Sequence, residues 1–353
     1  MSNKSSYYIK EYQMNTQKLR RLLRDLPEFC WEYFRGIENT TSILTRINYA
    51  YDLRIFFDFL LKEIDSFNGL SPTDFTVDLL NNIKAVHIEK FLEYTTFYSN
   101  PNNPEQNRQN NEMGKARKLA SIRSLLSYFY KREEIDRNIA QLVDLPKLSE
   151  KPIIRLDVDE VAKLLDTVET GKKLTKTQLR YQQYTRSRDL AILTLLLGTG
   201  IRISECIGLN IKDFDFKNNG FKVTRKGGDQ VILYYGDEVK RAILDYLEDR
   251  KKIITLPGHE DALFLSMQKR RISQRALQNL VQKYSKLVSP LKNITPHKLR
   301  STYGTTLYQE TGDIYLVADV LGHKDVNTTR KHYAAIGDEK RRMAARAVKL
   351  RED

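Results

Sequence analysis

A proline-bounded break near the middle of the chain limits the fold more than any other feature of the sequence. Residues 145–152 read Leu-Pro-Lys-Leu-Ser-Glu-Lys-Pro and show little hydrophobic periodicity. Proline fixes its own φ and has no backbone N–H, so a continuous helix or a central strand does not cross such a segment. We therefore expect this chain of 353 residues to form two domains, residues 1–145 and 153–353, joined by a linker over residues 146–152.

The charge of the chain points to a polyanionic partner. Lys and Arg number 59 against 45 Asp and Glu, which gives a net charge of +14. Such an excess favours nucleic acid, because binding releases counterions from the phosphates; a merely solvated basic surface is the alternative.

Other protein classes find little support in the sequence. Cys30 and Cys206 are too few for a disulfide framework and are expected to be reduced core residues of a cytoplasmic protein. The first residues show no apolar signal segment, and the most apolar run, residues 190–197, is too short to span a membrane. No Cys/His metal-ligand spacing and no Gly-rich phosphate loop occurs, so we expect no metal and no cofactor.

The first domain is expected to be a bundle of helices. Apolar side chains recur at helical spacing over residues 45–61 and again over residues 112–131. Thr40 or Thr41 is a suitable N-cap for the first of these helices, and the Asn- and Pro-rich residues 100–107 are expected to form a polar loop. The apolar stripes serve packing; the functional alternative is that the cationic faces of the helices lie on a duplex.

The second domain begins with helical patterns and then changes period. Asp157 or Asp159 is expected to cap a helix, residues 171–187 to form a polar loop, and residues 188–197 to form a buried helix that ends at a Gly-Thr-Gly run. Short strands and three further helices are expected next. The strands are placed at residues 214–216, 221–224 and 230–235, and the helices at 238–252, 273–287 and 296–310. The fold class is thus mainly α with a small antiparallel β-sheet.

A helix start near residue 295 carries two side chains that suit an anion. Thr295 is a good N-cap, and Pro296 fits the first helical position. His297 and Arg300 then share one helix face, beside the partial positive charge of the helix N-terminus. A phosphate would fit there; an ordinary capped surface helix is the alternative.

Two further cations lie upstream. Arg202 follows the Gly-Thr-Gly run, and Glu205 is placed to orient its guanidinium toward two phosphate oxygens; a structural ion pair is the alternative. Lys226 lies at the tip of the expected hairpin between residues 225 and 229. It is either a solvated turn residue or a proton donor to a leaving 5′ oxygen.

The last motif leads to a tyrosine. Asp313 is expected to cap a short apolar helix that Gly322 ends in a left-handed conformation, and His323 follows directly. A second short helix, capped by Asp325 or Asn327, then carries a phenol.

That phenol is Tyr333, and its neighbours bear on its reactivity. A phenol has a pKa of about 10 and is a poor nucleophile at neutral pH. Nearby cations stabilise the phenolate, and the same cations could hold a phosphodiester whose charge lies on non-bridging oxygens. The cluster therefore suggests a tyrosine that attacks DNA.

Taken in order, these motifs resemble those of the tyrosine recombinases of the phage integrase superfamily. The second half follows the family's order of Arg, Lys, His-x-x-Arg, His and Tyr, and the resemblance runs from about Thr41 to Ile336. Segments of the first half resemble the family's core-binding and final helices: Thr45-x-x-x-Tyr49-x-x-Asp52-Leu53-x-x-Phe56 and Arg117-x-Leu119-x-Ser121-x-x-x-Leu125. Within the superfamily the chain resembles the Xer-like recombinases, in particular the single-protein Xer systems of streptococci; related DNA invertases are the alternative. Ser301 departs from the pattern, since the family often has a further histidine there.

The resemblance implies a role for each matching residue and no cofactor. Tyr333 would form a 3′-phosphotyrosine bond, while Arg202 and Arg300 would clamp the scissile phosphate. The remaining roles would be proton transfer at the tyrosine for His297, a hydrogen bond to a non-bridging oxygen for His323, and general acid for Lys226.

The resemblance also implies a C-shaped clamp on double-stranded DNA. A helical SAM-like core-binding domain would face the catalytic domain across the duplex, and the candidate contacts of the first domain are Thr45, Arg46, Tyr49, Lys115, Arg117, Lys118 and Arg123. A homotetramer would form in the synapse on an inverted-repeat-like site, from free monomers or dimers, with a possible accessory protein. A C-terminal helix over residues 338–353 would pass between protomers.

Other functions remain open from the sequence. The implied activity is site-specific recombination by dimer resolution, inversion, integration or excision. A type IB topoisomerase-like monomer would use the same chemistry without a chosen site, and an inactive sequence-specific DNA-binding protein would use none. A metal-dependent transposase finds no acidic triad in the sequence.

Overall fold

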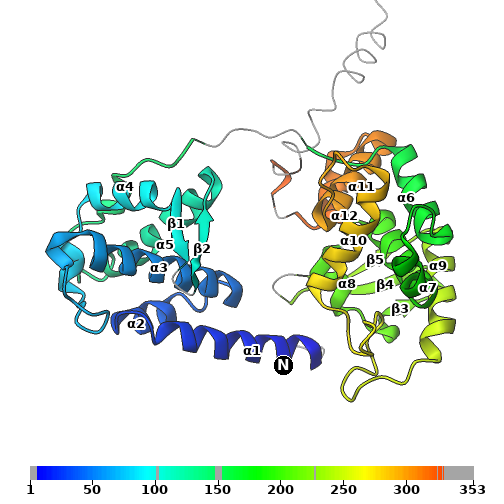
Figure 1. Ribbon diagram of the computed structural model, residues 1–353, viewed down its shortest axis with the longest axis horizontal. Coiled ribbons are helices and arrows are strands. Elements are labelled where there is room, and N and C mark those ends of the chain that lie inside the picture. Colours follow the sequence, from blue (N-terminus) through cyan, green and yellow to red (C-terminus); the bar gives the residue numbers. More distant parts are fainter. Residues whose placement is uncertain are drawn as a thin grey trace, which may run out of the picture. The chain divides into compact units, whose positions relative to one another are not determined.

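The chain forms two compact units, Met1–Lys151 and Pro152–Asp353. The computed structural model describes residues 6–100, 103–147, 153–225, 228–323, 325–327 and 329 (Figure 1). Each unit has its own secondary structure and core, and the two are described separately below.

Unit 1 is a helical bundle with one hairpin. Its helices are α1 (Ser6–Leu23), α2 (Phe29–Gly36), α3 (Ile43–Glu63), α4 (Ala85–Tyr94) and α5 (Glu112–Tyr130), with 3₁₀ turns at Asp65–Phe67, Asp78–Asn82 and Ile139–Gln141. Its strands are β1 (Phe97–Asn100) and β2 (Asn103–Gln109). The long α3 packs against both α1 and α5, which confirms the two amphipathic helices expected near residues 45–61 and 112–131.

Aromatic side chains fill the core of this unit. Phe56 lies 5.0 Å from Phe91 between ring centroids, and Phe29 lies 5.3 Å from Phe129, both edge-to-face. Such pairs favour edge contacts because the ring edge is positive and the ring face negative. Cys30 is fully buried beside them, and burial raises the pKa of its thiol, as expected for a core cysteine.

Two local predictions in unit 1 were wrong. The N-cap of α3 is Ser42, whose hydroxyl accepts a hydrogen bond from the backbone N–H of Thr45 at 3.2 Å. Thr41 instead donates to the carbonyl of Ile37 at 2.6 Å, so its hydroxyl completes the preceding turn. Residues 100–107 are also not a simple loop, because they take part in the antiparallel β1–β2 hairpin. Strand β2 covers most of these Asn- and Pro-rich residues and pairs with β1.

Unit 2 is mainly helical and contains the three-stranded sheet. Its helices are α6 (Val158–Thr170), α7 (Lys176–Thr199), α8 (Ile203–Gly208), α9 (Asp237–Lys251), α10 (Gln274–Val288), α11 (Pro296–Thr311) and α12 (Ile314–Leu321), with a 3₁₀ turn at Ile211–Asp213. Strands β3 (Phe214–Asp215), β4 (Gly220–Thr224) and β5 (Gln230–Tyr234) form an antiparallel sheet in chain order. The predicted strands and the last three predicted helices are confirmed.

The central helix of unit 2 is longer than predicted. Gly171 ends α6 with φ +73°, and Thr175 caps α7 by accepting from the N–H of Gln178, so residues 176–187 are helical and not a loop. The buried face of this half-helix is polar: Gln182 donates to the carbonyl of Val168 at 2.8 Å. Because the buried side chains are polar and internally hydrogen-bonded, the apolar periodicity that identifies a helix is missing from the sequence here. The predicted buried half and its glycine-rich end are confirmed, since Gly200 caps α7 with φ +62°.

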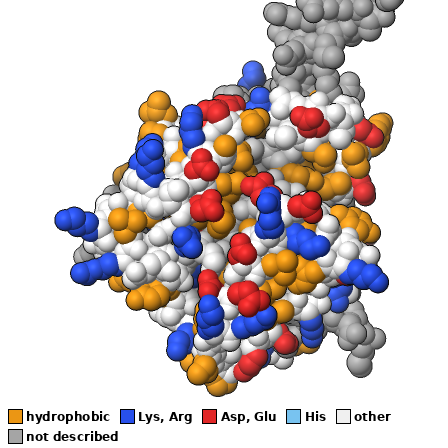
Figure 2. Space-filling view, turned by 90° about the vertical axis from the view of Figure 1, so that its right-hand side faces the viewer, with side chains coloured by type: hydrophobic (Ala, Val, Ile, Leu, Met, Phe, Trp, Pro, Cys, Tyr) orange, Lys and Arg blue, Asp and Glu red, His pale blue; other side chains and the backbone are white. Residues whose placement is uncertain are grey.

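Helices α6, α9 and α11 pack around α7. On the face of unit 2 that carries α7 and α9, Lys and Arg side chains are interspersed with Asp and Glu (Figure 2). Short ion pairs such as Lys251–Glu248 at 2.8 Å contribute to this mixture. Positive charge is therefore not concentrated on this face, and it lacks the one-signed field that attracts a polyanion.

Candidate active site

A tight turn after α7 places the first site residue. Gly200 adopts the left-handed conformation, and a Cβ atom at this position would lie 2.3 Å from Cδ1 of Tyr303 on α11. Only glycine meets both conditions without strain. Two residues later Arg202 occupies the N-cap position of α8, so the turn directs its side chain from a fixed point on the packed core.

Glu205 orients Arg202 through both carboxylate oxygens. Its Oε1 accepts from Nη1 of Arg202 at 2.8 Å, and its Oε2 accepts from the Arg202 backbone N–H at 2.8 Å. The Glu205 side chain is 4% exposed, whereas the Arg202 side chain is 34% exposed. The predicted pairing of these two residues is confirmed, and it leaves part of the guanidinium open to solvent.

Arg300 reaches the same place from α11. It is 4% exposed, and its Nη1 donates to the carbonyl of Gly200 at 2.6 Å. Its Nη2 donates to the carbonyl of Leu321, at the end of α12. Arg202 donates through Nη2 to the next carbonyl, that of Gly322, at 3.1 Å. Two arginines from distant parts of the sequence therefore converge on consecutive carbonyls immediately before His323.

The start of α11 is built largely as the sequence predicts. Pro296 is the first helical residue and Thr295 the N-cap, but the Thr295 side chain makes no capping hydrogen bond. His297 is exposed on the first turn, and Arg300 follows one turn later on the same side of the helix. Of these two side chains on α11, the His297 imidazole is therefore exposed to solvent and the Arg300 guanidinium is buried.

The end of α12 also follows the prediction. Asp313 accepts from the N–H groups of Tyr315 and Leu316, and Gly322 ends the helix with φ +62°. His323 comes next, and its backbone N–H donates to the carbonyl of Ala318 at 2.9 Å. This fixes the backbone that carries the imidazole.

A buried threonine orients that imidazole. Oγ1 of Thr329 lies 2.6 Å from Nδ1 of His323, and Thr329 is fully buried. A hydrogen bond on one ring nitrogen sets the direction of the other, so Nε2 is aimed by this contact. Sequence reasoning missed Thr329, because a threonine six residues after a histidine carries no distinguishing pattern.

The other predicted groups lie partly outside the described residues. Asp325 caps the following turn by accepting from the N–H of Asn327 at 2.8 Å, as predicted. Tyr333 and Lys226 are outside the described residues, as is the segment 338–353. Arg225, next to Lys226 in the chain, is described, and its side chain reaches the end of α12.

The candidate DNA contacts of unit 1 divide into internal and exposed groups. Lys118 is 2% exposed and donates to Asp52 at 3.3 Å, and Arg46 is buried against Glu38 at 3.0 Å. Both cations thus have carboxylate partners within unit 1: Asp52 is buried, and Glu38 is about half exposed. Desolvation raises the pKa of Asp52, although Lys118 and a further arginine oppose that shift.

The remaining candidates keep some exposed surface. Arg117 pairs with Asp52 and is about half exposed. Arg123 is partly buried and donates to the carbonyls of Ala140 and Val143. Lys115 pairs with Glu112 at 3.4 Å, and Thr45 and Tyr49 are half-buried.

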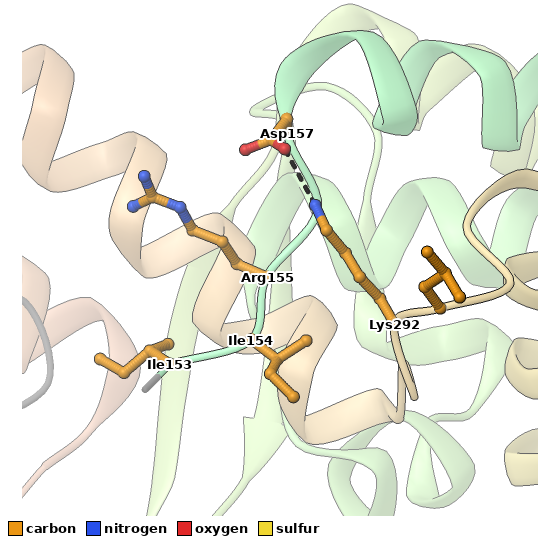
Figure 3. A pocket seen from close by; sticks show the side chains of 6 residues that line it. Ile153, Ile154, Arg155, Asp157 and Lys292 are labelled. Carbon is orange, nitrogen blue, oxygen red and sulfur yellow. Dashed lines mark hydrogen bonds and ion pairs between the residues drawn. The ribbon is translucent and has the colours of Figure 1, made fainter. Parts of the chain in front are cut away.

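A shallow pocket of about 360 Å³ lies elsewhere in unit 2. Ile153 and Ile154 line it, and Lys292 reaches across to Asp157 at 2.9 Å (Figure 3). The pocket contains none of the site residues above, and two of its charged groups, Lys292 and Asp157, are paired with each other. The convergence at the end of α12 is therefore the better candidate.

Guanidinium and imidazole groups thus gather at one helix end, in a helical unit with a three-stranded antiparallel sheet. A sequence model of the phage integrase family matches residues 154–340. The chain belongs to the phage integrase family, and within it to the Xer-like tyrosine recombinases.

Individual relatives agree with this assignment. Tyrosine recombinase XerC of Caldanaerobacter subterraneus subsp. tengcongensis is 34% identical over 316 residues, which cover 86% of this chain and 81% of the relative. Tyrosine recombinase XerS of Streptococcus uberis is 29% identical over an alignment covering 92% of this chain and 96% of the relative. The crystal structure of the XerH site-specific recombinase bound to difH substrate shares the fold, with a TM-score of 0.63 at 21% identity, covering 89% of this chain and 81% of that one.

Proposed function

We propose that this protein is a site-specific DNA recombinase that cuts and rejoins strands through a 3′-phosphotyrosine intermediate on Tyr333. The observation that carries this proposal is the convergence of Arg202 and Arg300 on the consecutive carbonyls of Leu321 and Gly322. Guanidinium groups remain charged at all relevant pH values and can each grip two oxygens of a phosphate. Two of them beside one helix end suit a phosphate whose negative charge grows in the transition state.

The proposed reaction conserves the energy of the phosphodiester bond, because one phosphate ester is exchanged for another. The Tyr333 oxygen attacks phosphorus, a tyrosyl O–P bond forms, and the bond from phosphorus to the 5′ oxygen breaks. Lys226 supplies the proton to the leaving 5′ oxygen, and His297 accepts or returns the tyrosyl proton. The released 5′ hydroxyl of another strand then reverses the reaction, so rejoining needs no ATP and no metal.

His323 would hold a non-bridging oxygen in this scheme. Thr329 supports that role, because its contact with Nδ1 fixes the orientation of the ring and with it the direction in which Nε2 points. When the Thr329 hydroxyl donates to Nδ1, Nε2 carries the proton and acts as a hydrogen-bond donor.

The proposed partner is double-stranded DNA with an inverted-repeat-like site. The net charge of +14 supports this partner. Affinity for DNA is expected to fall steeply as the salt concentration rises, because the release of counterions from the phosphates becomes less favourable. Thr45, Tyr49, Lys115, Arg117 and Arg123 are the proposed contacts of unit 1, because each keeps some exposed surface. The XerH protein of known structure is bound to its own difH substrate.

The proposed active form is a tetramer on DNA, reached from a free monomer or dimer. A helix over residues 338–353 is proposed to dock on the neighbouring protomer, since its sequence has a thin apolar stripe that buries too little to stand alone. Deleting these residues is expected to preserve binding to a single site and to weaken assembly. Unchanged tetramer formation on DNA would refute this part of the proposal.

The proposed site of action is the cytoplasm. Among the described residues, no helix combines the length and the apolar character needed to cross a membrane.

A nicked suicide substrate tests the proposed function. The nick lets a short strand diffuse away after cleavage, so the wild-type protein should become trapped as a covalent protein–DNA adduct. Tyr333→Phe should bind the site with unchanged affinity and form no adduct, because only the hydroxyl is removed. An adduct formed by the Phe variant would show that the nucleophile is another residue.

Adduct formation and a plasmid-relaxation assay together separate the alternatives. A type IB topoisomerase-like monomer would relax any supercoiled plasmid without a chosen site, whereas the proposed recombinase needs its site and a synapse. Recombinases match this chain over 86% to 92% of its length, including unit 1, which favours site-specific recombination over relaxation. An inactive DNA-binding protein would form no adduct at all.

A further inference from the structure

Arg225 lies at the end of β4 and bonds to a different part of unit 2. Its Nη2 donates to the carbonyl of Val320 at 2.9 Å and to that of Asp319 at 3.2 Å. The guanidinium also lies against Gly322, where an added Cβ atom would be 2.0 Å from Nη1 of Arg225. The β4–β5 hairpin is therefore joined to the C-terminal end of α12 through one side chain.

The backbone of Arg225 also closes the loop of the hairpin. Its N–H donates to the carbonyl of Asp229 at 2.8 Å, and its carbonyl accepts from the N–H of Gly228 at 3.0 Å. Arg225, Gly228 and Asp229 thus form the base of the hairpin loop, and the Arg225 side chain fixes the position of that base. Lysine has a long flexible stem, so the reach of a lysine that follows Arg225 in the chain depends on where Arg225 is fixed.

The carbonyls of residues 319–322 receive hydrogen bonds from three arginines. Arg225 bonds the first two, Arg300 the third and Arg202 the fourth. The last carbonyls of a helix lack partners within the helix and carry partial negative charge. The C-terminal end of α12 therefore holds the β4–β5 hairpin, Arg202 and Arg300 in fixed positions relative to one another.

We propose that Arg225 is a positioning residue that sets the hairpin tip, and with it the general acid, relative to the Arg202–Arg300 pair. This inference rests on the proposed function, because it concerns the delivery of the proton from Lys226 to the leaving 5′ oxygen. Arg225 does not touch the reacting atoms; it acts by tying the hairpin to α12. Loss of the hydrogen bonds from Arg225 to α12 should slow proton transfer to the leaving 5′ oxygen. It should leave DNA binding and the attack by Tyr333 unchanged.

A sulfur substitution isolates that step. In a substrate with a 5′-bridging phosphorothiolate, the leaving group is a thiolate that needs no proton, so a defect in the general acid is bypassed. We expect Lys226→Ala to cleave the ordinary suicide substrate slowly, by about 10²-fold or more, and to recover on the sulfur substrate. Arg225→Ala should slow cleavage of the ordinary substrate by about 10- to 100-fold, as for a misplacement of about 1 Å, and should recover in the same way.

Two controls complete the design. Lys222→Ala removes another positive charge from β4 and should leave both rates unchanged, because Lys222 is exposed and pairs with Asp213 at 3.9 Å. Arg225→Lys keeps the charge but loses the forked donors, so it should fall between wild type and Arg225→Ala. Hydrogen exchange of the full-length protein should show faster exchange in Arg225→Ala at residues 228–230 and at the end of α12.

The outcomes are distinct. Equal slowing of Arg225→Ala on both substrates, or no slowing on either, would overturn the inference and indicate a direct phosphate contact or no role. Unchanged hydrogen exchange in Arg225→Ala would also overturn it, whatever the rates. Failure of the sulfur substrate to restore Lys226→Ala would instead count against the proposed general acid, while the exchange data would still decide whether Arg225 holds the hairpin.

Discussion

Glu205→Gln is the most direct perturbation of the proposed active site. Glu205 has two oxygens for two donors, the guanidinium and the backbone N–H of Arg202, each at 2.8 Å. A glutamine has one oxygen, so its amide NH₂ group faces one of these donors unfavourably. Arg202 therefore loses either its orientation or its helix cap, although the shape of the side chain is kept.

The size of the effect follows from the burial of the pair. Replacing a charge-assisted hydrogen bond, worth about 1.5–3 kcal/mol, by a neutral one worth about 0.5–1.5 kcal/mol lowers the unfolding free energy by roughly 1–1.5 kcal/mol. If the guanidinium shifts by about 1 Å, cleavage slows by roughly 10- to 100-fold. The assay is single-turnover formation of the covalent adduct on the suicide substrate, with the dissociation constant for the site measured in parallel. We expect the dissociation constant to change little, because many phosphates contribute to binding.

Glu160→Gln provides a matched control. Glu160 occupies the same third helical position in α6, where it accepts from the Asp157 N–H at 2.8 Å in a capping box like that of α8. This variant should lower stability by a similar amount and leave the cleavage rate unchanged. Cleavage by Glu205→Gln at the wild-type rate, or an equal loss in both variants, would show that the orientation of Arg202 does not matter for the chemistry.

The remaining predictions concern stability and pH. Gly200→Ala should lower the unfolding free energy by about 2–4 kcal/mol in chemical denaturation, since it adds left-handed strain and a clash with Tyr303; a loss below about 0.5 kcal/mol would contradict the packing described for this turn. Burial would raise the pKa of Glu160, but hydrogen bonds, that from Lys292 foremost, lower it overall. Its stabilising effect should therefore be complete above the unfolded pKa of about 4.3 and vanish as the pH falls through the folded value; a stability difference between wild type and Glu160→Gln that stays constant down to about pH 2 would exclude this linkage. Phe129→Ala should lower the unfolding free energy of unit 1 by about 3–5 kcal/mol, so that DNA binding is lost at a lower temperature than in wild type. Loss of binding at the same temperature in both proteins would argue against a shared aromatic core.

Three candidate site residues lie next to helix-capping or glycine signals in the sequence, and the helix ends that carry them could therefore be predicted. Arg202, Arg300 and His323 each follow a capping or glycine signal that fixes a helix end, so their backbone positions could be predicted from the neighbouring letters. Thr329 and Arg225 could not be found in this way. Their partners are a ring nitrogen and helix-end carbonyls, and only the folded chain brings these groups together.

The errors elsewhere have similar physical causes. The helix over residues 176–187 buries polar side chains such as Gln182, so its sequence lacks the apolar periodicity by which a helix is predicted. Lys118 is a candidate DNA contact that lies off the apolar stripe of its helix; its partner Asp52 comes from another helix, and no local pattern reveals that pair. Residues 100–107 were expected to form a polar loop because of their Asn and Pro content, yet Asn103–Gln109 forms strand β2, whose pairing with β1 no local pattern reveals.

The end of α12 has a consequence for synthesis on the ribosome. Arg202, Arg225 and Arg300 are translated well before the carbonyls of residues 319–322 that they bind. A nascent polypeptide thus carries these cations before the scaffold that aligns them exists. Products truncated before α12 would lack both this scaffold and the proposed nucleophile Tyr333, so they should be unable to cut DNA.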